Sequence, residues 1–295
     1  MDQALHVFVT VAEQQNFTRA AELLHMTQPA VSSYIQNLER SMDIKLLERT
    51  NKFVRLTKAG EMVYHHAKEI LGLYTRMENL LDDLKHTASG NLSIGSSYTY
   101  GEYILPHRMA ALLKSYPQLN PSITIRNSNE IMDLVLHHQI DVGIIEGEVK
   151  NEKIKIMPFA CDHLSILAAS DHRLFHTQNI SPLDLSEETW LIREEGSGTR
   201  GMQEKGFQQL GFYPNKRMTL GSTQVIKESI EAGLGISLLS QSAIQKELEL
   251  GKLKLLDIEG FPIKRNFSLI TPNVPFQTKA AEVFIKLLVE EGSTG

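Results

Sequence analysis

The sequence of 295 residues predicts an α/β fold preceded by a helix-rich N-terminal module. Three observations support this. The stretch from Asn16 to Lys58 has the pattern of a helix-turn-helix followed by a two-stranded wing. Between Val63 and Leu84, apolar residues recur at the spacing of a long helix that pairs with another helix. From Leu92 onward, short apolar strands alternate with helical segments, as in βαβ units around a largely parallel sheet.

The first two helices of the module are short. Residues 1–15 should form an opening helix, because apolar side chains recur there at helical spacing: Leu5, Phe8, Val9 and Ala12. Thr18 is a suitable N-cap for the next helix, whose residues are good helix formers and which should end near Met26. These helices should pack behind a third one.

The third helix should run from Thr27 or Gln28, either of which can cap it, to about Arg40, with Pro29 in its first turn. Its apolar face comprises Val31, Ile35 and Leu38. Small and amide side chains lie on or beside the opposite face: Gln28, Ala30, Ser32, Ser33, Tyr34, Gln36 and Asn37. Small residues permit close approach to a duplex and amides bind base edges or phosphates, so this face suits a DNA major groove.

The wing region is basic. The segment contains two acidic residues, Asp43 and Glu48, and six cationic ones: Arg40, Lys45, Arg49, Lys52, Arg55 and Lys58. Such a cluster would bind phosphates, although a solvated charged turn beside an ordinary helical pair has the same composition. Because the whole chain carries a net charge of −5, DNA affinity would have to come from this local patch, presented more than once by an oligomer.

The composition argues against a membrane protein, a secreted protein and a metal-binding protein. With 42% hydrophobic residues the chain is globular, and it contains neither a membrane-length apolar run nor a secretion signal, so we expect a cytoplasmic protein with no membrane partner. The single cysteine, Cys161, excludes an intramolecular disulfide and is expected to be a core thiol. Neither histidine pair, His65-His66 nor His137-His138, can chelate one ion alone, because neighbouring helix residues point about 100° apart. We expect no metal or cofactor.

The long helix should extend from about Lys58 to Lys85. Its apolar stripe alternates steps of four and three residues: Val63, Ala67, Ile70, Tyr74, Met77, Leu81 and Leu84. Polar residues at most intervening positions favour a dimer seam, while a helix buried in its own chain is the alternative. A dimer would present two DNA-recognition helices to a pseudo-palindromic target with half-sites about one helical turn apart.

A hinge is expected at residues 87–91, Thr87 to Asn91, where the helical pattern breaks. Strands are predicted at 92–95, 122–126, 141–145, 164–169, 190–192, 218–220, 236–239 and 267–271. Helices are predicted at 103–116, 130–137, 200–210, 224–232 and about 275–290. The last segments would return the chain to the first of two lobes that share a crevice.

Three loops should line that crevice, because ligands of open α/β sheets bind outside the carboxyl ends of the strands. They are residues 96–99, 127–130 and 195–200. The third loop combines glycines, two hydroxyls, a helix N-terminus and Arg200, which together make a candidate anion site. An ordinary capped helix start remains an alternative for it, as does a capping box for Asn127 with Glu130.

The segments FTRAAELLHMTQPAVSSYIQNLE and LLERTNKFVRLTKAGE resemble the N-terminal signature of LysR-type transcriptional regulators, and the resemblance extends over the whole chain. It implies a winged helix-turn-helix (1–58), a dimerisation helix (59–86), the hinge (87–91) and a regulatory domain (92–295). That domain would have two Rossmann-like lobes of the periplasmic-binding-protein type, lobe I at about 92–163 and 268–295 and lobe II at about 164–267. A tetramer built as a dimer of dimers is also implied.

The resemblance also implies DNA contacts at Gln28, Pro29, Ala30, Ser32, Ser33, Gln36, Lys52 and Arg55. Thr18 and Arg49 are further candidates. Many relatives carry a basic residue in place of Ser33, so a bidentate arginine contact with guanine is absent there. Promoter DNA is the expected partner, with RNA polymerase as a further candidate.

Effector contacts are implied at Ser97, Thr99, Ser128, Ser197, Gly198, Thr199 and Arg200, with Thr223 as an additional candidate. The segments GSGTR and TYGEYILP resemble the branch that includes regulators of sulfur, nitrogen and carbon assimilation, so a small anionic effector is expected. Two other functions compete with this interpretation. A cytoplasmic small-molecule-binding protein could use the same crevice, and an enzyme could use Ser97 or the GSGTR loop, but neither GxSxG nor GxxxxGK[ST] is present.

Overall fold

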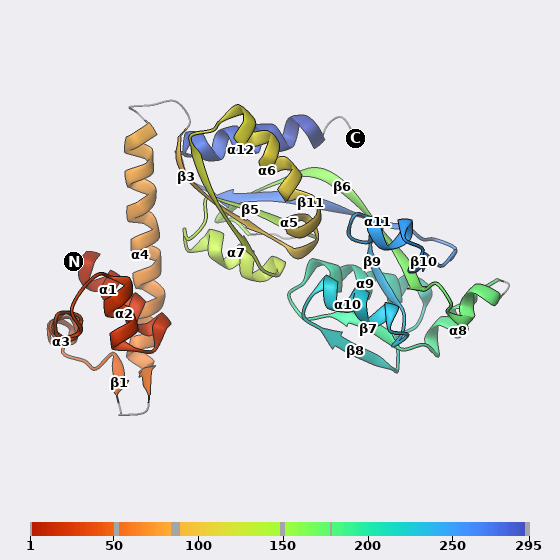
Figure 1. Ribbon diagram of the computed structural model, residues 1–295, viewed down its shortest axis with the longest axis horizontal. Helices are drawn as coiled ribbons and strands as arrows, with labels where there is room; N and C mark the ends of the chain where they lie inside the picture. Colours follow the sequence, from red (N-terminus) through yellow and green to blue (C-terminus); the bar gives the residue numbers. More distant parts are fainter. Residues whose placement is uncertain (1, 50–52, 84–88, 148–150, 178, 293–295) are drawn as a thin grey trace. The chain divides into compact units, whose positions relative to one another are not determined.

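The computed structural model describes residues 2–49, 53–83, 89–147, 151–177 and 179–292 (Figure 1). The chain divides into two compact units, Met1–Leu81 with His137–Gln139, and Asp82–Leu136 with Ile140–Gly295. None of the described helices combines the length and the apolar character that crossing a lipid bilayer would require. The predicted α/β fold with a helix-rich N-terminal module is confirmed.

The N-terminal unit contains α1 (Asp2–Gln14), α2 (Phe17–Leu23), α3 (Gln28–Met42) and most of α4 (Lys58–Asp83). Its wing is the antiparallel pair β1 (Leu47–Arg49) and β2 (Val54–Leu56). The predicted core face of α3 is confirmed, because Val31, Ile35 and Leu38 are buried against α1 residues such as Phe8. Gly60 lies against the wing: a Cβ there would stand 2.0 Å from the Leu46 carbonyl oxygen, so only glycine fits.

Two helix boundaries differ from the sequence prediction. Thr18 is not the N-cap of α2: Asn16 is, and its side chain accepts hydrogen bonds from the backbone N–H groups of Thr18 and Arg19. An asparagine two residues upstream therefore satisfies the donors that Thr18 was expected to satisfy. The α3 cap is Thr27 as predicted, but the helix continues to Met42 and ends at Asp43, which is left-handed (φ 49°).

The C-terminal unit is built on one sheet in the order β10-β6-β11-β5-β3-β4, with β9 also paired to β6. Its strands are β3 (Gly90–Ser96), β4 (Leu119–Ile125), β5 (Val142–Glu146), β6 (Ile154–Ala169), β9 (Ser237–Ser240), β10 (Leu253–Leu255) and β11 (Ile263–Pro272). A separate parallel pair is formed by β7 (Trp190–Arg193) and β8 (Arg217–Leu220). The helices are α5 (Tyr98–Tyr103), α6 (Leu105–Ser115), α7 (Ser128–Leu136), α8 (Pro182–Ser186), α9 (Gly198–Leu210), α10 (Thr223–Glu231), α11 (Gln241–Glu249) and α12 (Lys279–Gly292), with a 3-10 turn at Arg173–His176.

Two long antiparallel strands, β6 and β11, connect two lobes (Figure 1). The C-terminal half of β11 pairs with β5 in lobe I, where α6 and α12 cover one face of the sheet and α7 the other. The C-terminal half of β6 pairs with β9 in lobe II, which also contains β7 to β10 and α8 to α11. Asp162 and Arg265 are partners in register between these halves, so they mark the passage from lobe to lobe.

Several predicted elements are corrected. The helix expected at 103–116 corresponds to α6, which starts at Leu105 with Pro106 in its first turn, and the short helix α5 before it was not predicted. β6 is much longer than the expected 164–169, and α11 and β10 were not predicted. Cys161 is exposed rather than a core thiol, although apolar residues precede it. Thr87 and Ala88 of the predicted hinge lie outside the described residues, as do Leu84 and Lys85 of the long helix.

Candidate functional site

The candidate DNA-binding surface lies on α3 and the wing. Side chains on the face opposite the core are exposed or half-buried, and they include the predicted contacts Thr18, Gln28, Pro29, Ala30, Ser32, Ser33, Gln36, Arg49 and Arg55. Gln28 donates a hydrogen bond to Ser32, 3.0 Å away, so those two side chains are ordered along the helix. Lys52 lies outside the described residues. The described candidates combine amides, hydroxyls and two arginines on the solvent side of the unit.

Glu39 was not predicted from the sequence to have a role, and it is only 3% exposed. Its carboxylate accepts hydrogen bonds from the backbone N–H groups of Leu46 and Leu47 and from Lys45 Nζ (3.0, 3.2 and 2.8 Å). Burial alone would raise its pKa, but these donors hold the pKa of Glu39 below its ordinary value. Glu39 therefore ties the end of α3 to the start of the wing. Its place one turn after buried Ile35 was the available signal.

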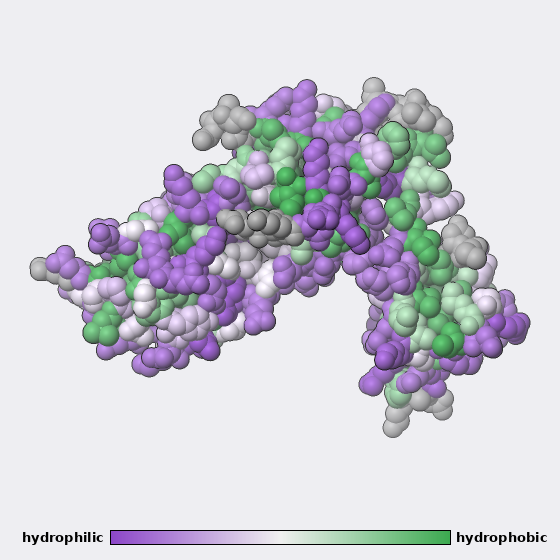
Figure 2. All heavy atoms as spheres, turned by 180° about the vertical axis from the view of Figure 1, so that it is seen from behind, coloured by the Kyte–Doolittle hydropathy of each residue, from purple (hydrophilic) through white to green (hydrophobic). Residues whose placement is uncertain are grey.

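The predicted dimer seam on the long helix α4 consists of a buried part and an exposed part. Ala67 is 1% exposed and Val63 is half-buried, because both pack on the core of their own unit. Further along, the predicted seam residues are exposed: Ile70, Tyr74, Met77 and Leu81. Figure 2 shows hydrophobic side chains, in green, on the surface of this unit. Met62 and Leu73, which were not predicted, are exposed as well, so exposed apolar side chains recur along α4 from Met62 to Leu81.

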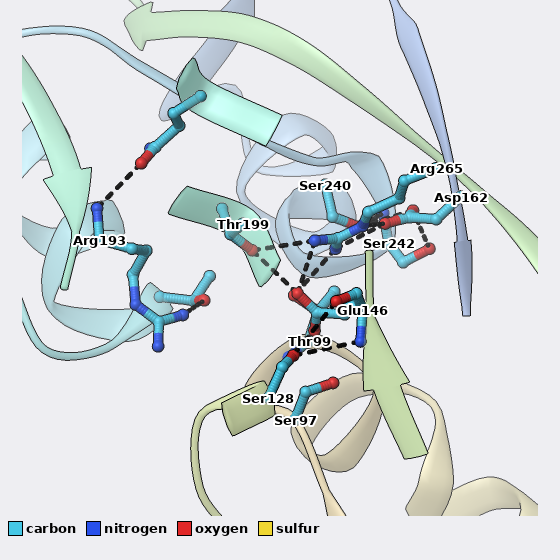
Figure 3. A network of polar contacts seen from close by, with 12 residues as sticks. Ser97, Thr99, Ser128, Glu146, Asp162, Arg193, Thr199, Ser240, Ser242 and Arg265 are labelled. Carbon is cyan, nitrogen blue, oxygen red and sulfur yellow. Dashed lines mark hydrogen bonds and ion pairs between the residues drawn. The ribbon is translucent and has the colours of Figure 1, made fainter. Parts of the chain in front are cut away.

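In the C-terminal unit, a buried network joins the two lobes around Glu146 (Figure 3). Glu146 is the last residue of β5 and is 3% exposed. Its Oε1 accepts from the Thr99 backbone N–H (3.0 Å), and its Oε2 accepts from Thr199 Oγ1 (3.0 Å) and from Arg265 Nη1. Thr99 belongs to lobe I and Thr199 to lobe II, so one carboxylate receives donors from both lobes.

Arg265 extends the network along the connecting strands. Its Nε donates to Asp162 Oδ2 at 2.7 Å and its Nη2 donates to Thr99 Oγ1 at 3.1 Å. The other Asp162 oxygen accepts from Ser240 Oγ at 2.8 Å. One guanidinium thus faces two carboxylates, which gives these three residues one net negative charge. Burial would raise the pKa of Glu146, but Arg265 holds it below its ordinary value.

The structure gathers most of the predicted effector residues around Glu146. Ser97, Thr99, Ser128 and Thr199 are buried there (Figure 3). Ser128 Oγ bonds to both the backbone N–H and the carbonyl of Glu146 (3.2 and 3.3 Å). The Ser97 hydroxyl is 2% exposed and makes no hydrogen bond of normal geometry with any described residue, although it lies close enough to help lower the pKa of Glu146.

Arg200 and Thr223 lie in other contacts. Arg200 donates to Glu204 (2.6 Å), to the Arg193 carbonyl (3.1 Å) and to Tyr213 (3.2 Å). Thr223 Oγ1 accepts from Arg193, whose guanidinium also pairs with Glu194 and stacks on the Tyr98 ring, 4.6 Å from its centroid. Both residues thus support the position of Arg193 instead of adjoining Glu146.

A pocket of about 380 Å³ opens beside Glu146 between the two lobes. It is lined by Ser128, Asn129, Glu146 and Gly147 from lobe I and by Gly196, Ser197, Gly198, Gly201, Met202 and Lys205 from lobe II. The lobes touch at its edge, where the Asn129 N–H donates to the Gly196 carbonyl at 3.2 Å. The predicted loops 127–130 and 195–200 therefore do meet.

Glu146 itself could have been found, because it follows a predicted strand at the carboxyl edge of the sheet, where the other site residues were sought. Asp162 and Arg265 could not, because they are 103 positions apart and only strand register brings them together. A charged side chain inside a strand pattern gives no indication of its partner. The hydroxyls of the site could therefore be predicted from the sequence, whereas its buried charged residues could not.

Comparison with known proteins agrees with both halves of this description. Residues 3–61 match the family "Bacterial regulatory helix-turn-helix protein, lysR family" and residues 85–293 match "LysR substrate binding domain". The chain is 38% identical over 284 residues to the HTH-type transcriptional regulator CysL of Bacillus subtilis (strain 168), covering 96% of this chain and 95% of CysL.

Two solved structures are similar in fold. The regulatory domain of CcmR from Synechocystis PCC6803, in complex with 2-PG, is 28% identical, with a TM-score of 0.64 over 69% of this chain and 98% of that domain. Full-length CbnR in complex with its target DNA is 24% identical, with a TM-score of 0.74 over 99% of both chains, and shows a shared fold. By its helix-turn-helix, its two-lobed regulatory unit and these matches, the chain belongs to the LysR family of transcriptional regulators.

Proposed function

We propose that this LysR-type regulator binds a pseudo-palindromic promoter site in double-stranded DNA as an oligomer, and that a small anionic effector in the interlobe pocket alters that binding. The proposed DNA binding is supported by the two faces of α3. One face is buried and contains Val31 and Ile35, and the other is exposed and presents amides and hydroxyls. A helix with this division can enter a major groove without losing its core contacts.

Base recognition would depend mainly on Gln36 and Gln28, because amides can make bidentate contacts with adenine. Arg49 and Arg55 would bind phosphates, which gives affinity without sequence preference. Replacing Gln36 by Ala should therefore reduce discrimination between operator and unrelated DNA, by about 1–3 kcal/mol. Replacing Arg55 by Ala should weaken binding to every sequence alike and lower the salt slope by about one. Equal weakening on all sequences by the Gln36 variant would contradict its role.

Oligomerisation would use the exposed apolar face of α4, at Ile70, Tyr74, Met77 and Leu81. An exposed row of large apolar side chains on a long helix favours pairing with a second helix. Two copies would place two α3 helices on a two-fold site, as a pseudo-palindrome requires. A tetramer and a contact with RNA polymerase remain predictions from the family resemblance.

Effector binding would use the pocket beside Glu146, whose walls come from both lobes. A ligand there would touch Ser128 and Asn129 on one side and the loop Gly196 to Gly198 on the other, so it could bias how the lobes close. The CcmR regulatory domain, 28% identical, has its structure in complex with 2-PG, which supports a comparable ligand here. Arg200 would then act on the site through the Arg193 carbonyl that it holds.

The testing experiment is footprinting of the full-length chain on the DNA upstream of its own gene, with and without a panel of small anionic metabolites. A protected pseudo-palindrome whose footprint changes with one compound is the expected result. Binding should weaken steeply between about 50 and about 200 mM salt, because counterions are released from the phosphates. No protection even at low salt would contradict the proposed function.

A further inference from the structure

Three side chains that can bind a metal ion meet on α4 and on the segment His137–Gln139, which belongs to the same N-terminal unit. His65 and Glu69 are about one turn apart on α4, so their side chains lie on the same face of that helix. Glu69 Oε1 stands 3.8 Å from His65 Nε2 and 3.6 Å from His137 Nε2. The candidate ligand atoms of the three side chains all lie within 4.8 Å of one another. Two imidazoles and one carboxylate are therefore close enough to share one ion.

These distances are close to those of a zinc site. In a tetrahedral site each nitrogen or oxygen ligand is about 2.1 Å from the ion, so two ligand atoms stand about 3.4 Å apart. The two distances to Glu69 Oε1 are only slightly longer than this. The rings of His65 and His137 already pack edge to face, with their centroids 4.3 Å apart. All three side chains are partly exposed, so small rotations would bring their atoms to zinc distance and a water molecule would complete the fourth position.

A fourth side chain orients the carboxylate. His66 Nδ1 is hydrogen-bonded to Glu69 Oε2 at 3.0 Å, and the other oxygen, Oε1, is the one near His65 and His137. Carboxylates that bind metal ions are commonly hydrogen-bonded to an outer partner of this kind, which fixes their orientation. His66 is therefore a positioning residue beside the three candidate ligands.

Gly72 allows the segment with His137 to lie against α4. A Cβ at Gly72 would stand 2.5 Å from the carbonyl oxygen of His138 and 3.2 Å from that of His137. Both obstacles are backbone atoms, so any side chain at this position would displace the segment. His138 has a left-handed conformation, with φ 55°, at the turn that follows His137. The position of His137 beside Glu69 thus depends on the backbone of both elements.

We propose that His65, Glu69 and His137 bind one divalent transition-metal ion, for which zinc is the best match. No metal site is predicted from the sequence, because neither adjacent pair of histidines can chelate an ion alone. The fold instead brings together one histidine of each pair and adds a carboxylate. Imidazole ligands favour zinc over magnesium or calcium, which prefer sites made of oxygen atoms. The bound ion would hold His137–Gln139 on α4, and the inference depends neither on DNA binding nor on the interlobe pocket.

The test is calorimetric titration of the tag-free, full-length chain with zinc chloride at constant pH and ionic strength. The wild type should bind one Zn²⁺ per chain and should show no binding of Mg²⁺. His65→Ala, Glu69→Gln and His137→Ala should each bind Zn²⁺ at least about tenfold more weakly, because loss of even an outer partner of a metal ligand commonly costs this much. His107→Ala is the matched control, since His107 is exposed on α6 and lies outside the cluster. Cys161→Ser is a second control, for the exposed thiol. Both controls should bind Zn²⁺ as the wild type does.

A further variant tests the arrangement without removing a ligand. Gly72→Ala keeps all three ligands but displaces the segment that carries His137, so its Zn²⁺ affinity should also fall at least about tenfold. Alanine is a better helix former than glycine, so α4 itself should be preserved. Gly201→Ala is the control, because Gly201 also lies in a helix and no atom lies within 4 Å of its added Cβ.

Four results would overturn the inference. The first is no saturable Zn²⁺ binding by the wild type, and the second is equal affinity in the wild type and the three ligand variants. The third is weaker binding by the His65 and Glu69 variants with normal binding by His137→Ala and Gly72→Ala, since the ion would then be held by α4 alone. The fourth is an equal loss in His107→Ala, which would show adventitious binding to surface histidines.

Discussion

Gly198 lies directly against Glu146: a Cβ at Gly198 would stand 2.4 Å from both the Cβ and the carbonyl oxygen of Glu146. The first residue of α9 in lobe II is thus packed on the last residue of β5 in lobe I. Because the obstacle includes backbone, the strain cannot be relieved by rotating a flexible side chain. Gly198 is therefore required for the two lobes to approach this closely.

The first prediction is that Gly198→Ala forces the lobes apart at the pocket. The extra methyl should destabilise the regulatory unit by about 1–3 kcal/mol, as overpacking does elsewhere. Urea unfolding of the full-length chain measures this. Gly221→Ala is the matched control, because no atom lies within 4 Å of its added Cβ. If both variants have the same free energy of unfolding, the close contact at Gly198 does not limit the stability of the protein.

The second prediction concerns Arg265. Replacing it by Met leaves Glu146 and Asp162 buried together without their cation, which should cost about 3–5 kcal/mol near neutral pH. Lys286→Met is the control, since Lys286 pairs with Glu290 where both side chains are exposed, and its loss should cost at most about 1 kcal/mol.

The pH dependence of the same variant has a definite sign. In the wild type the pKa of Glu146 is lowered, so its stabilising contribution is complete above the ordinary carboxyl pKa and is lost as the pH falls through the folded value. Without Arg265, burial raises that pKa instead. The free energy of unfolding that Arg265→Met loses relative to wild type should therefore become smaller as the pH is lowered from about 8 to about 5. A deficit that is constant over this range would show that Arg265 acts by packing alone.

The sequence predicted the parts of this protein whose signals are local. The α3 cap at Thr27, the apolar face of α3 and most βα alternations follow from short-range propensity and periodicity. The interlobe hydroxyls could also be located, because they follow strands at the carboxyl edge of the sheet. The resemblance to LysR-type regulators then indicated which of those loops to combine.

Several of the missed features depend on contacts distant in sequence. Cys161 follows three apolar residues, yet its side chain points outward from a strand whose neighbour Asp162 points inward, because alternate residues face opposite sides. Val63 and Ala67 fit the heptad as well as Ile70 does, but they pack on the helix-turn-helix core. Periodicity identifies an apolar stripe and does not identify the partner that covers it.

The third prediction is that Glu39→Gln loosens the wing. Glu39 accepts two backbone N–H groups of the wing and Lys45, and its lowered pKa shows that the ionised form is the one stabilised. Its contribution is therefore present at neutral pH and lost as the pH falls through the folded pKa. The variant should lose about 1–3 kcal/mol of stability and bind all DNA sequences more weakly, without altered preference. Glu48→Gln, on the exposed side of β1, is the control in unfolding and DNA-binding titrations.

The fourth prediction tests the exposed face of α4. Met77 is 48% exposed and lies between Tyr74 and Leu81 along that face. A lysine there would place a charge inside the proposed helix pair, so Met77→Lys should shift the proposed dimer toward monomer in sedimentation experiments. DNA affinity for the full pseudo-palindrome should fall more than affinity for an isolated half-site, because only the former needs two copies. Thr75→Lys is the control, because Thr75 is exposed and lies about 100° or more around the helix from Tyr74, Met77 and Leu81, so its lysine stays outside the apolar face and should leave the association state unchanged. Dissociation by both variants alike would point to general charge effects on α4, and association unaffected by Met77→Lys would place the dimer contact elsewhere.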